Sequence, residues 1–476
     1  MKIKDNWALP DLDQAARRTR AAVERVDRFY IPAHAVDMGK GRTAYISTYG
    51  CQANERDSET LAGMLEILGY ELVSRPEEAD VILINTCAIR DNAMEKVLGE
   101  MGSYKRLAKN RPGMIIGVCG CMSQEDEFVR RVIDHYPWVN LIFGTHNLQD
   151  LPELLMEAED GRRVVKVYSR QGEVYENLPV SRFGKHKAWV NIMYGCDKFC
   201  TYCIVPYTRG KQRSRTMENI LKEVSELIGQ GYREVTLLGQ NVNAYGKDLE
   251  DGASFAVLLE AVAKTGIERI RFMTSHPWDF SDEMIDIIAR YPNIMPYIHL
   301  PLQSGDDEIL ARMGRRYTSK EYKELFDKIR AAIPNVAIST DIIVGFPNES
   351  DEAFEHTLDM VRACKFDLAY TFIYSPRPHT PAARMEDPID METKKRRLYK
   401  LNETWNAYAL EKMKALEGTI VQVLVDGPSK KDKSVYSGYT DTNKLVNFTG
   451  EDVKAGDLAD VYVDTAKTFS LDGHKV

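Results

Sequence analysis

Three cysteines on one short loop are the strongest chemical signal in the sequence. Cys196, Cys200 and Cys203 have a C-x3-C-x2-C spacing and follow an apolar run that ends at Tyr194. Three thiolates can bind three irons of a 4Fe–4S cubane and leave the fourth iron without a protein ligand. Since an electron-transfer cluster has four Cys ligands, that open position indicates a cluster that binds and activates another molecule.

A zinc ion is the alternative occupant of such a loop. Structural zinc sites have four ligands, usually from paired C-x2-C elements. The sequence has no fourth Cys or His close to this loop. The number of ligands therefore favours the iron–sulfur cluster.

Three further cysteines each follow an apolar run in the first third of the chain. We predict that Cys51, Cys87 and Cys121 stand at the carboxyl ends of parallel strands. Such ends meet at one edge of a sheet, so the three thiols should converge in space. Cys119 shares a strand face with Cys121, but Cys121 lies beyond the apolar run and is the favoured ligand. We interpret Cys119, and Cys364 on an amphipathic stretch, as buried structural residues.

The predicted elements place both cysteine sets at strand ends and define an α/β fold class. Residues 41–158 alternate apolar runs with amphipathic stretches, which indicates a parallel sheet with helices on both faces. Residues 186–376 repeat a strand–helix unit about six times and predict a partial (β/α)6 barrel, with function at the strand C-terminal ends. With the basic helix that follows, they form a core domain of residues 186–414. Short alternating strands in residues 415–476 predict a small OB-like β-barrel. Residues 1–40 form a polar arm, and residues 159–185 form a connector.

Together these features resemble the methylthiotransferase family of radical S-adenosylmethionine (SAM) enzymes. The resemblance covers nearly everything after residue 40, and the terminal barrel is similar to the RNA-binding TRAM domain. The segments Thr48-Tyr49-Gly50-Cys51-Gln52 and residues 201–210 are similar to one branch of the family. That branch is MiaB, the tRNA-2-methylthio-N6-dimethylallyladenosine synthases. In the ribosomal-protein branch the first Cys segment typically reads Leu-Gly-Cys-Pro.

The resemblance implies two 4Fe–4S clusters, with SAM bound at the cluster of Cys196, Cys200 and Cys203. One SAM is expected to methylate a sulfur on the first-domain cluster. Reductive cleavage of a second SAM is expected to give a radical that removes hydrogen from C2 of N6-isopentenyladenosine next to the tRNA anticodon, where the methylated sulfur is inserted. The resemblance also implies a SAM site made of Tyr202, Gly239, Gln240, Asn241, Ser275, Gln303, Thr340, Asp341 and Val344.

Basic residues indicate where the tRNA anticodon stem–loop could be held. We expect phosphate contacts from four residues soon after the cluster loop: Arg209, Lys211, Arg213 and Arg215. A solvated charged face is the alternative, as for most charge runs. The terminal barrel has one local basic cluster: Lys430, Lys431 and Lys433. The other expectations are a low-potential electron donor as a partner and a monomeric state.

The composition says more about the cellular location of the protein than about whether it binds nucleic acid. The formal net charge of −8 over 476 residues argues weakly against nucleic-acid binding, but a basic face can lie on an acidic protein. No apolar run is long enough to span a bilayer, and the first forty residues mix acidic and basic side chains unlike a signal peptide. We therefore expect a cytoplasmic protein without membrane contact and without disulfides, in which the clustered cysteines are metal ligands or redox groups.

Two other functions remain open at this point. Within the same family, the substrate could be an aspartate of a ribosomal protein. In a different class, the chain could be a non-catalytic iron–sulfur sensor that binds RNA. A sensor needs no SAM site, so the candidate residues at the strand ends count against it.

Overall fold

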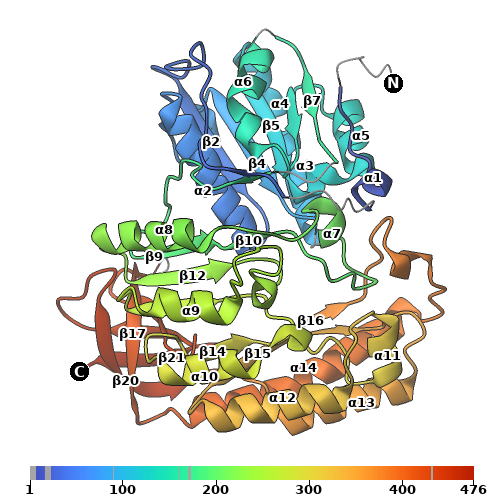
Figure 1. The fold of residues 1–476 in the computed structure, drawn as a ribbon, viewed down its shortest axis with the longest axis vertical. Helices are drawn as coiled ribbons and strands as arrows, with labels where there is room; N and C mark the ends of the chain where they lie inside the picture. Colours follow the sequence, from blue (N-terminus) through green and yellow to red (C-terminus); the bar gives the residue numbers. More distant parts are fainter. Residues whose placement is uncertain (1–6, 17–22, 89–90, 160, 170–172, 430–431) are drawn as a thin grey trace.

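A six-stranded parallel sheet forms the first part of the chain in a computed structural model (Figure 1). The structure describes residues 7–16, 23–88, 91–159, 161–169, 173–429 and 432–476. Parts of the predicted arm and connector, and Lys430 and Lys431, lie outside these ranges. The strand order is β3-β2-β4-β5-β6-β7. The strands are β2 (Thr43–Thr48), β3 (Glu71–Leu72), β4 (Val81–Thr86), β5 (Ile115–Gly120), β6 (Leu141–Phe143) and β7 (Val164–Lys166).

Helices bury both faces of this sheet, as the apolar runs predict. Side chains alternate between the two faces along each strand: Leu83 packs with α2 and α6, whereas Ile82 and Ile84 pack with α3 and α5. The helices are α2 (Gln52–Ile67), α3 (Asp91–Ser103), α4 (Lys105–Asn110), α5 (Asp126–His135) and α6 (Leu151–Glu159). A strand that is covered on both faces is rich in apolar residues at successive positions, as in Val81–Ile84 of β4 and Ile115–Val118 of β5.

The N-terminal arm is attached to the rest of the protein at several points. Trp7 packs on the first domain, and its Nε1 donates to the carbonyl of Arg163 over 3.1 Å. Beyond α1 (Leu12–Ala16), β1 (Arg25–Val26) pairs in parallel with β8 (Val174–Tyr175) of the connector. The arm therefore packs against both the first domain and the connector.

Six parallel strands form the central part as two three-stranded sheets, β9-β12-β13 and β14-β15-β16. Backbone hydrogen bonds of Ile270 to residues 293 and 295 join the two sheets, which gives the predicted partial barrel. The strands are β9 (Lys187–Asn191), β12 (Glu234–Leu238), β13 (Arg269–Phe272), β14 (Tyr297–His299), β15 (Ala337–Val344) and β16 (Leu368–Ile373). The cluster loop is followed by α7 (Val205–Thr208), and β10 (Met193–Tyr194) pairs with β11 (Arg213–Ser214).

The outer helices of the partial barrel start where the sequence provides caps. Ser or Thr precedes each of the main ones, and its side chain accepts a backbone N–H from the first turn. These helices are α8 (Met217–Gly229), α9 (Phe255–Ala263), α10 (Asp282–Arg290), α12 (Ser319–Ala332) and α13 (Asp351–Cys364), with the shorter α11 (Asp307–Arg312). The long α14 (Met391–Lys414) then leads to the last domain.

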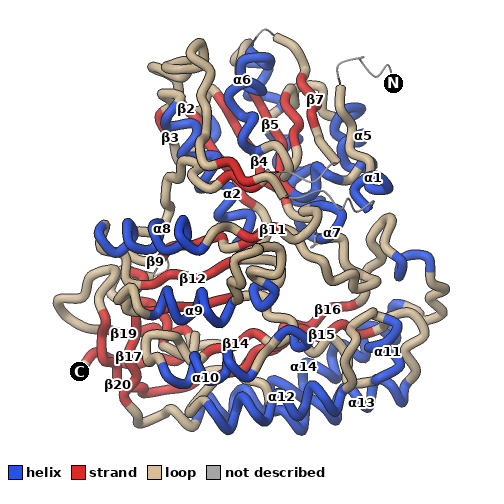
Figure 2. The backbone as a smooth tube through the Cα atoms, viewed as in Figure 1, coloured by secondary structure: helices blue, strands red, loops and turns tan. Residues whose placement is uncertain are grey.

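The last domain is a closed five-stranded barrel with the order β17-β18-β19-β21-β20. Its strands are β17 (Ile420–Pro428), β18 (Tyr436–Thr440), β19 (Leu445–Thr449), β20 (Leu458–Ala466) and β21 (Leu471–Lys475). Arg269 and Arg271, at the start of β13, donate to backbone carbonyls of residues 439–441. The small barrel is thus attached at the strand N-terminal ends of the core, away from the first domain (Figure 2). Among the helices of the described ranges, none is long and apolar enough to cross a membrane.

Candidate functional site

The first three cysteines meet at the carboxyl edge of the six-stranded sheet. Cys51 is the N-cap of α2, Cys87 directly follows β4, and Cys121 directly follows β5. The thiol of Cys87 lies close enough to Cys51 to lower the pKa of that thiol. Gly50 permits this approach, because a Cβ at that position would lie 2.6 Å from the Cβ of Cys87.

Cys119 and Cys121 point to different surroundings. Cys119 is fully buried among Leu83, Leu141 and other core side chains between the sheet and α2. Gly120 then takes a φ of 92°, a left-handed conformation that turns the chain. Cys121 consequently packs with Ile204 and Tyr207 of the central part. This geometry supports the choice of Cys121 over Cys119 as a ligand.

Arg209 links the first cysteine set to the central domain. Its Nε donates to Cys121 Sγ over 3.1 Å, and its Nη2 lies 2.7 Å from the carboxylate of Asp57 in α2. The hydrogen bond from Cys87 lowers the pKa of Cys51 to about 5, and the charge of Arg209 acts in the same direction. Burial raises the pKa of Cys121 to about 11, although Arg209 opposes this rise. A buried cation beside these sulfurs favours the thiolates that iron requires.

The second cysteine set lies on the loop after β10, where Cys196 and Cys200 are buried and Cys203 is half-buried. Gly195 starts the loop with a φ of 72°, and a Cβ there would lie 2.2 Å from the carbonyl oxygen of Lys211. Burial raises the pKa of Cys196 to about 12 and also raises that of Cys203. Arg315 donates from Nη1 to Cys200 Sγ over 3.4 Å. Each cysteine set therefore has one buried arginine at a sulfur, Arg209 for the first and Arg315 for the second.

The arrangement of the thiols suits a cubane. Within the described ranges, no three His, Cys, Asp or Glu side chains converge on a position for a single metal ion. A cubane requires a different arrangement, because each thiolate binds a different iron. In each set the charge of one thiol raises the pKa of another. The thiols of a set are therefore neighbours, although they do not converge on one metal position.

Polar side chains at the strand ends beyond the second set fit a bound polar ligand. Among the buried atoms without a hydrogen-bond partner in the described residues, four belong to predicted SAM residues: Gln240 Oε1, Asn241 Oδ1, Ser275 Oγ and Gln303 Oε1. Such atoms are costly to bury unless a ligand or water satisfies them. Gln303 also has a φ of 69°, and Thr274 beside Ser275 has a φ of 66°. Strained backbone of this kind occurs at ligand sites, so these residues fit the amino and carboxylate groups of SAM.

The remaining predicted SAM residues lie in different settings. Tyr202 packs edge-on against Phe346 at 6.5 Å. A Cβ at Gly239 would lie 2.5 Å from the side chain of Met193. Asp341 faces the barrel interior, 3.3 Å from His299 Nε2. On the opposite face of β15, Val344 packs in the core and the hydroxyl of Thr340 accepts from the backbone of Leu302, so a contact to SAM from these two positions would have to come from the backbone.

The predicted phosphate contacts of three arginines require correction. Arg209, Arg213 and Arg215 are 7%, 6% and 3% exposed. Arg209 is engaged by Cys121 and Asp57 as described above. Arg215 pairs with Glu176 over 3.1 Å and with Glu223 over 2.5 Å. Buried guanidinium groups cannot reach a phosphate on the surface; only Lys211 is partly exposed, and its contact with RNA remains a prediction.

Several residues that hold the site were not predicted from the sequence. Asp57 fixes Arg209, Arg315 contacts Cys200, and Asp279 accepts from Lys198, Lys247 and Asn241. One signal was present: α2 begins with two turns of mostly polar residues, yet the side chains from Asn54 to Thr60 are mostly buried. A polar helix start directly after a cysteine is therefore a sign of a buried polar site.

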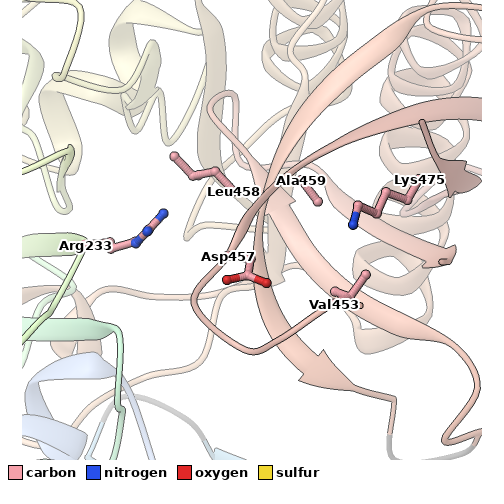
Figure 3. Close-up of a pocket in the computed structure, with 6 residues that line it drawn as sticks. All are labelled: Arg233, Val453, Asp457, Leu458, Ala459 and Lys475. Carbon is pink, nitrogen blue, oxygen red and sulfur yellow. The ribbon is translucent and has the colours of Figure 1, made fainter. Parts of the chain in front are cut away.

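A surface hollow elsewhere is not part of this site. It has a volume of about 180 Å³ and lies between Arg233 of the central part and Asp457, Val453 and Lys475 of the terminal barrel (Figure 3). Its lining residues come from the junction of these two domains rather than from the strand C-terminal ends. We assign it no role in the chemistry.

Sequence comparisons match three parts of the chain. Residues 190–361 match the Radical SAM superfamily, residues 43–144 match the Uncharacterized protein family UPF0004, and residues 414–476 match the TRAM domain. The tRNA-2-methylthio-N(6)-dimethylallyladenosine synthase of Geobacillus kaustophilus is 55% identical over 469 residues, which cover 98% of this chain and 88% of that protein. The protein of the same name in Bacillus subtilis is 53% identical over 98% of this chain and 92% of its own length.

The chain belongs to the tRNA-2-methylthio-N(6)-dimethylallyladenosine synthase family. This confirms the predicted family, and the matched domains confirm the fold class and the expectation of SAM and 4Fe–4S clusters. A radical SAM methyltransferase of Kitasatospora setae (TsrM), solved with cobalamin and a 4Fe–4S cluster, has a TM-score of 0.54 at 14% identity over 72% of this chain and 77% of its own. At that identity the likeness concerns the fold alone.

Proposed function

We propose that this chain adds a methylthio group at C2 of N6-isopentenyladenosine next to the anticodon of tRNA. The observation that carries the proposal is the convergence of two three-thiol sites on one domain interface. Arg209 follows the second cysteine loop, yet its guanidinium contacts Cys121 of the first set. Nearly full-length identity of 53–55% to synthases of this family supports the same reaction.

The residues divide into three roles in this proposal. Cys51, Cys87 and Cys121 hold one 4Fe–4S cluster, and Cys196, Cys200 and Cys203 hold the other. The side chains of Gln240, Asn241, Ser275 and Gln303 bind the polar groups of SAM, because their buried atoms need partners. When bound, the clusters and SAM supply a reactive radical and a methylated sulfur, which the unactivated C2–H bond requires.

The protein's own side chains orient and desolvate the reactants. Arg209 holds positive charge beside the thiols of the first set, and Asp57 fixes its position. Leu12, Ala88, Cys121, Ile204 and Tyr207 pack together between the arm, the first domain and the central part. This apolar contact keeps water away from the first cysteine set, which protects reactive intermediates.

The proposal also includes the partners of the protein and the bounds of its domains. The substrate is the anticodon stem–loop, and a low-potential donor supplies the electrons for SAM cleavage. The chain works as a monomer in the cytoplasm, where tRNA is found. Its units are the arm 1–40, the cluster domain 41–158, the connector 159–185, the core 186–414 and the TRAM domain 415–476.

A reconstituted reaction tests this function. Enzyme with both clusters, SAM and a reductant is incubated anaerobically with an anticodon stem–loop that carries the prenyl group or plain adenosine. We expect the 2-methylthio nucleoside by mass spectrometry, with the prenylated RNA strongly preferred, because a pocket that buries five carbons gains about 0.8 kcal/mol per CH₂. Product on a ribosomal protein and none on RNA would contradict the proposal. Equal turnover of both RNAs would remove prenyl recognition from it.

A further inference from the structure

An exposed indole lies beside the second cysteine loop. Trp278 lies in a short turn, Pro277–Asp279, that follows β13, and it is 47% exposed. Its backbone N–H donates to Nδ1 of the buried His276. Ser275, with its buried unpaired hydroxyl, is only three residues away. The ring therefore belongs to the turn that directly follows the strand end with the candidate SAM residue Ser275.

Cations surround this ring. Lys198 Nζ, from the second cysteine loop, lies 4.0 Å from the ring centroid, and the Arg316 guanidinium lies 5.2 Å from it. The buried carboxylate of Asp279 pairs with Lys198 over 2.8 Å and with Lys247 over 2.6 Å. Since two ammonium groups share one carboxylate and Arg316 adds another cation, these four side chains carry a net positive charge.

The same carboxylate connects this patch with the SAM site. Asn241 donates from Nδ2 to Asp279 over 2.8 Å, while its Oδ1 is one of the buried atoms without a partner. Lys198 belongs to the loop between Cys196 and Cys200. The position of the indole is thus coupled through Asp279 to both the cluster loop and a candidate SAM ligand.

We propose that Trp278 is a stacking platform for a nucleobase of the anticodon loop, with Lys247 and Arg316 meeting the adjacent phosphates. An aromatic face within a cationic rim is the arrangement by which proteins hold single-stranded RNA, since every base has a face to stack and every nucleotide a phosphate. The inference rests on the proposed function, because it names the surface that presents the target adenosine to the site. It also supplies the RNA contact that the buried Arg213 and Arg215 cannot make.

Anaerobic binding of a labelled anticodon stem–loop to the enzyme with both clusters tests the platform. We expect Trp278→Ala to weaken binding about 5- to 100-fold, as for loss of one stacked base, and Trp278→Phe to retain most of the affinity. Trp138→Phe is the matched control, because Lys105 lies over the Trp138 ring at 5.4 Å. Trp138 precedes β6, at the edge of the first sheet opposite to the cysteines. Lys247→Ala should flatten the salt dependence by about one phosphate contact.

Single abasic substitutions in the loop complete the test. One of them should weaken binding to the wild-type protein but have little further effect on Trp278→Ala, because the base and the ring act as a pair. If Trp278→Ala binds the RNA as tightly as the wild type, the platform is wrong. The proposed function would still stand, provided that the wild-type enzyme holds its iron and forms product. Absence of product from the wild-type enzyme would count against the function itself.

Discussion

Replacing Cys196, Cys200 and Cys203 together by Ala should leave about half of the iron and abolish cleavage of SAM. Three thiols hold one cluster, and the buried unpaired atoms of the SAM site lie beyond this second set. The first cysteine set stays intact at its own sheet edge, so its cluster should remain. Iron analysis and chromatographic measurement of 5′-deoxyadenosine provide the readouts.

The reciprocal variant, with Cys51, Cys87 and Cys121 replaced, should separate the two activities. It should also keep about half of the iron and still cleave SAM, but form no methylthio product. Cys119→Ala and Cys364→Ala are matched controls, because both thiols are buried in cores away from the two sets. Full iron retention in either triple variant would refute the ligand assignment, and iron loss in Cys119→Ala would show that the wrong member of the pair was chosen.

Arg209→Met should destabilise the protein by about 3–5 kcal/mol, the usual cost of leaving one partner of a buried ion pair without the other. The side chains of Arg209 and Asp57 are 8% and 5% exposed, and the guanidinium also donates to Cys121. Loss of a positive charge beside the first cluster should lower its reduction potential, because hydrogen bonds and charge at the sulfurs set that potential. Denaturant unfolding and a redox titration followed by EPR measure the two effects.

A double variant distinguishes this pairing from general disruption of the interface. Arg209→Met with Asp57→Leu should lose less stability than the sum of the single changes, because the double variant leaves no unpaired charge. Additive losses, or a single variant within about 1 kcal/mol of the wild type, would contradict the assigned role. Arg213 offers a comparison nearby, since its Nη2 donates to the backbone carbonyl of Arg209 over 3.4 Å.

Both thiol sets could be predicted from the sequence, because each cysteine is recognised by its immediate surroundings. The second set lies on one short loop. Each cysteine of the first set follows one apolar run, and strand ends in a parallel sheet share an edge, so convergence follows from topology alone. The starts of α9 and α13 also follow from the sequence, since Ser254 and Ser350 cap these helices. Cys121 could be preferred to Cys119 because it lies past the apolar run.

Contacts between distant segments were not predictable. Arg209 reads as one member of a basic run after the cluster loop, and only the packing of the first domain onto that loop shows that it meets Cys121, 88 positions earlier. Arg215 was misread for the same reason, because Glu176 and Glu223 come from the connector and from α8. A run of basic residues is usually exposed, but acidic residues from distant elements can bury it, and the sequence does not show which elements pack together. Trp278 lacked a signal of its own, since a single Trp is more often buried.

Transfer of hydrogen from C2 of the target adenosine tests the central claim most directly. A prenylated anticodon stem–loop with deuterium at that carbon is turned over by the enzyme with both clusters, and the 5′-deoxyadenosine formed is analysed by mass spectrometry. The account predicts that deuterium appears in 5′-deoxyadenosine in proportion to the 2-methylthio product. Methylthio product accompanied only by unlabelled 5′-deoxyadenosine would contradict it.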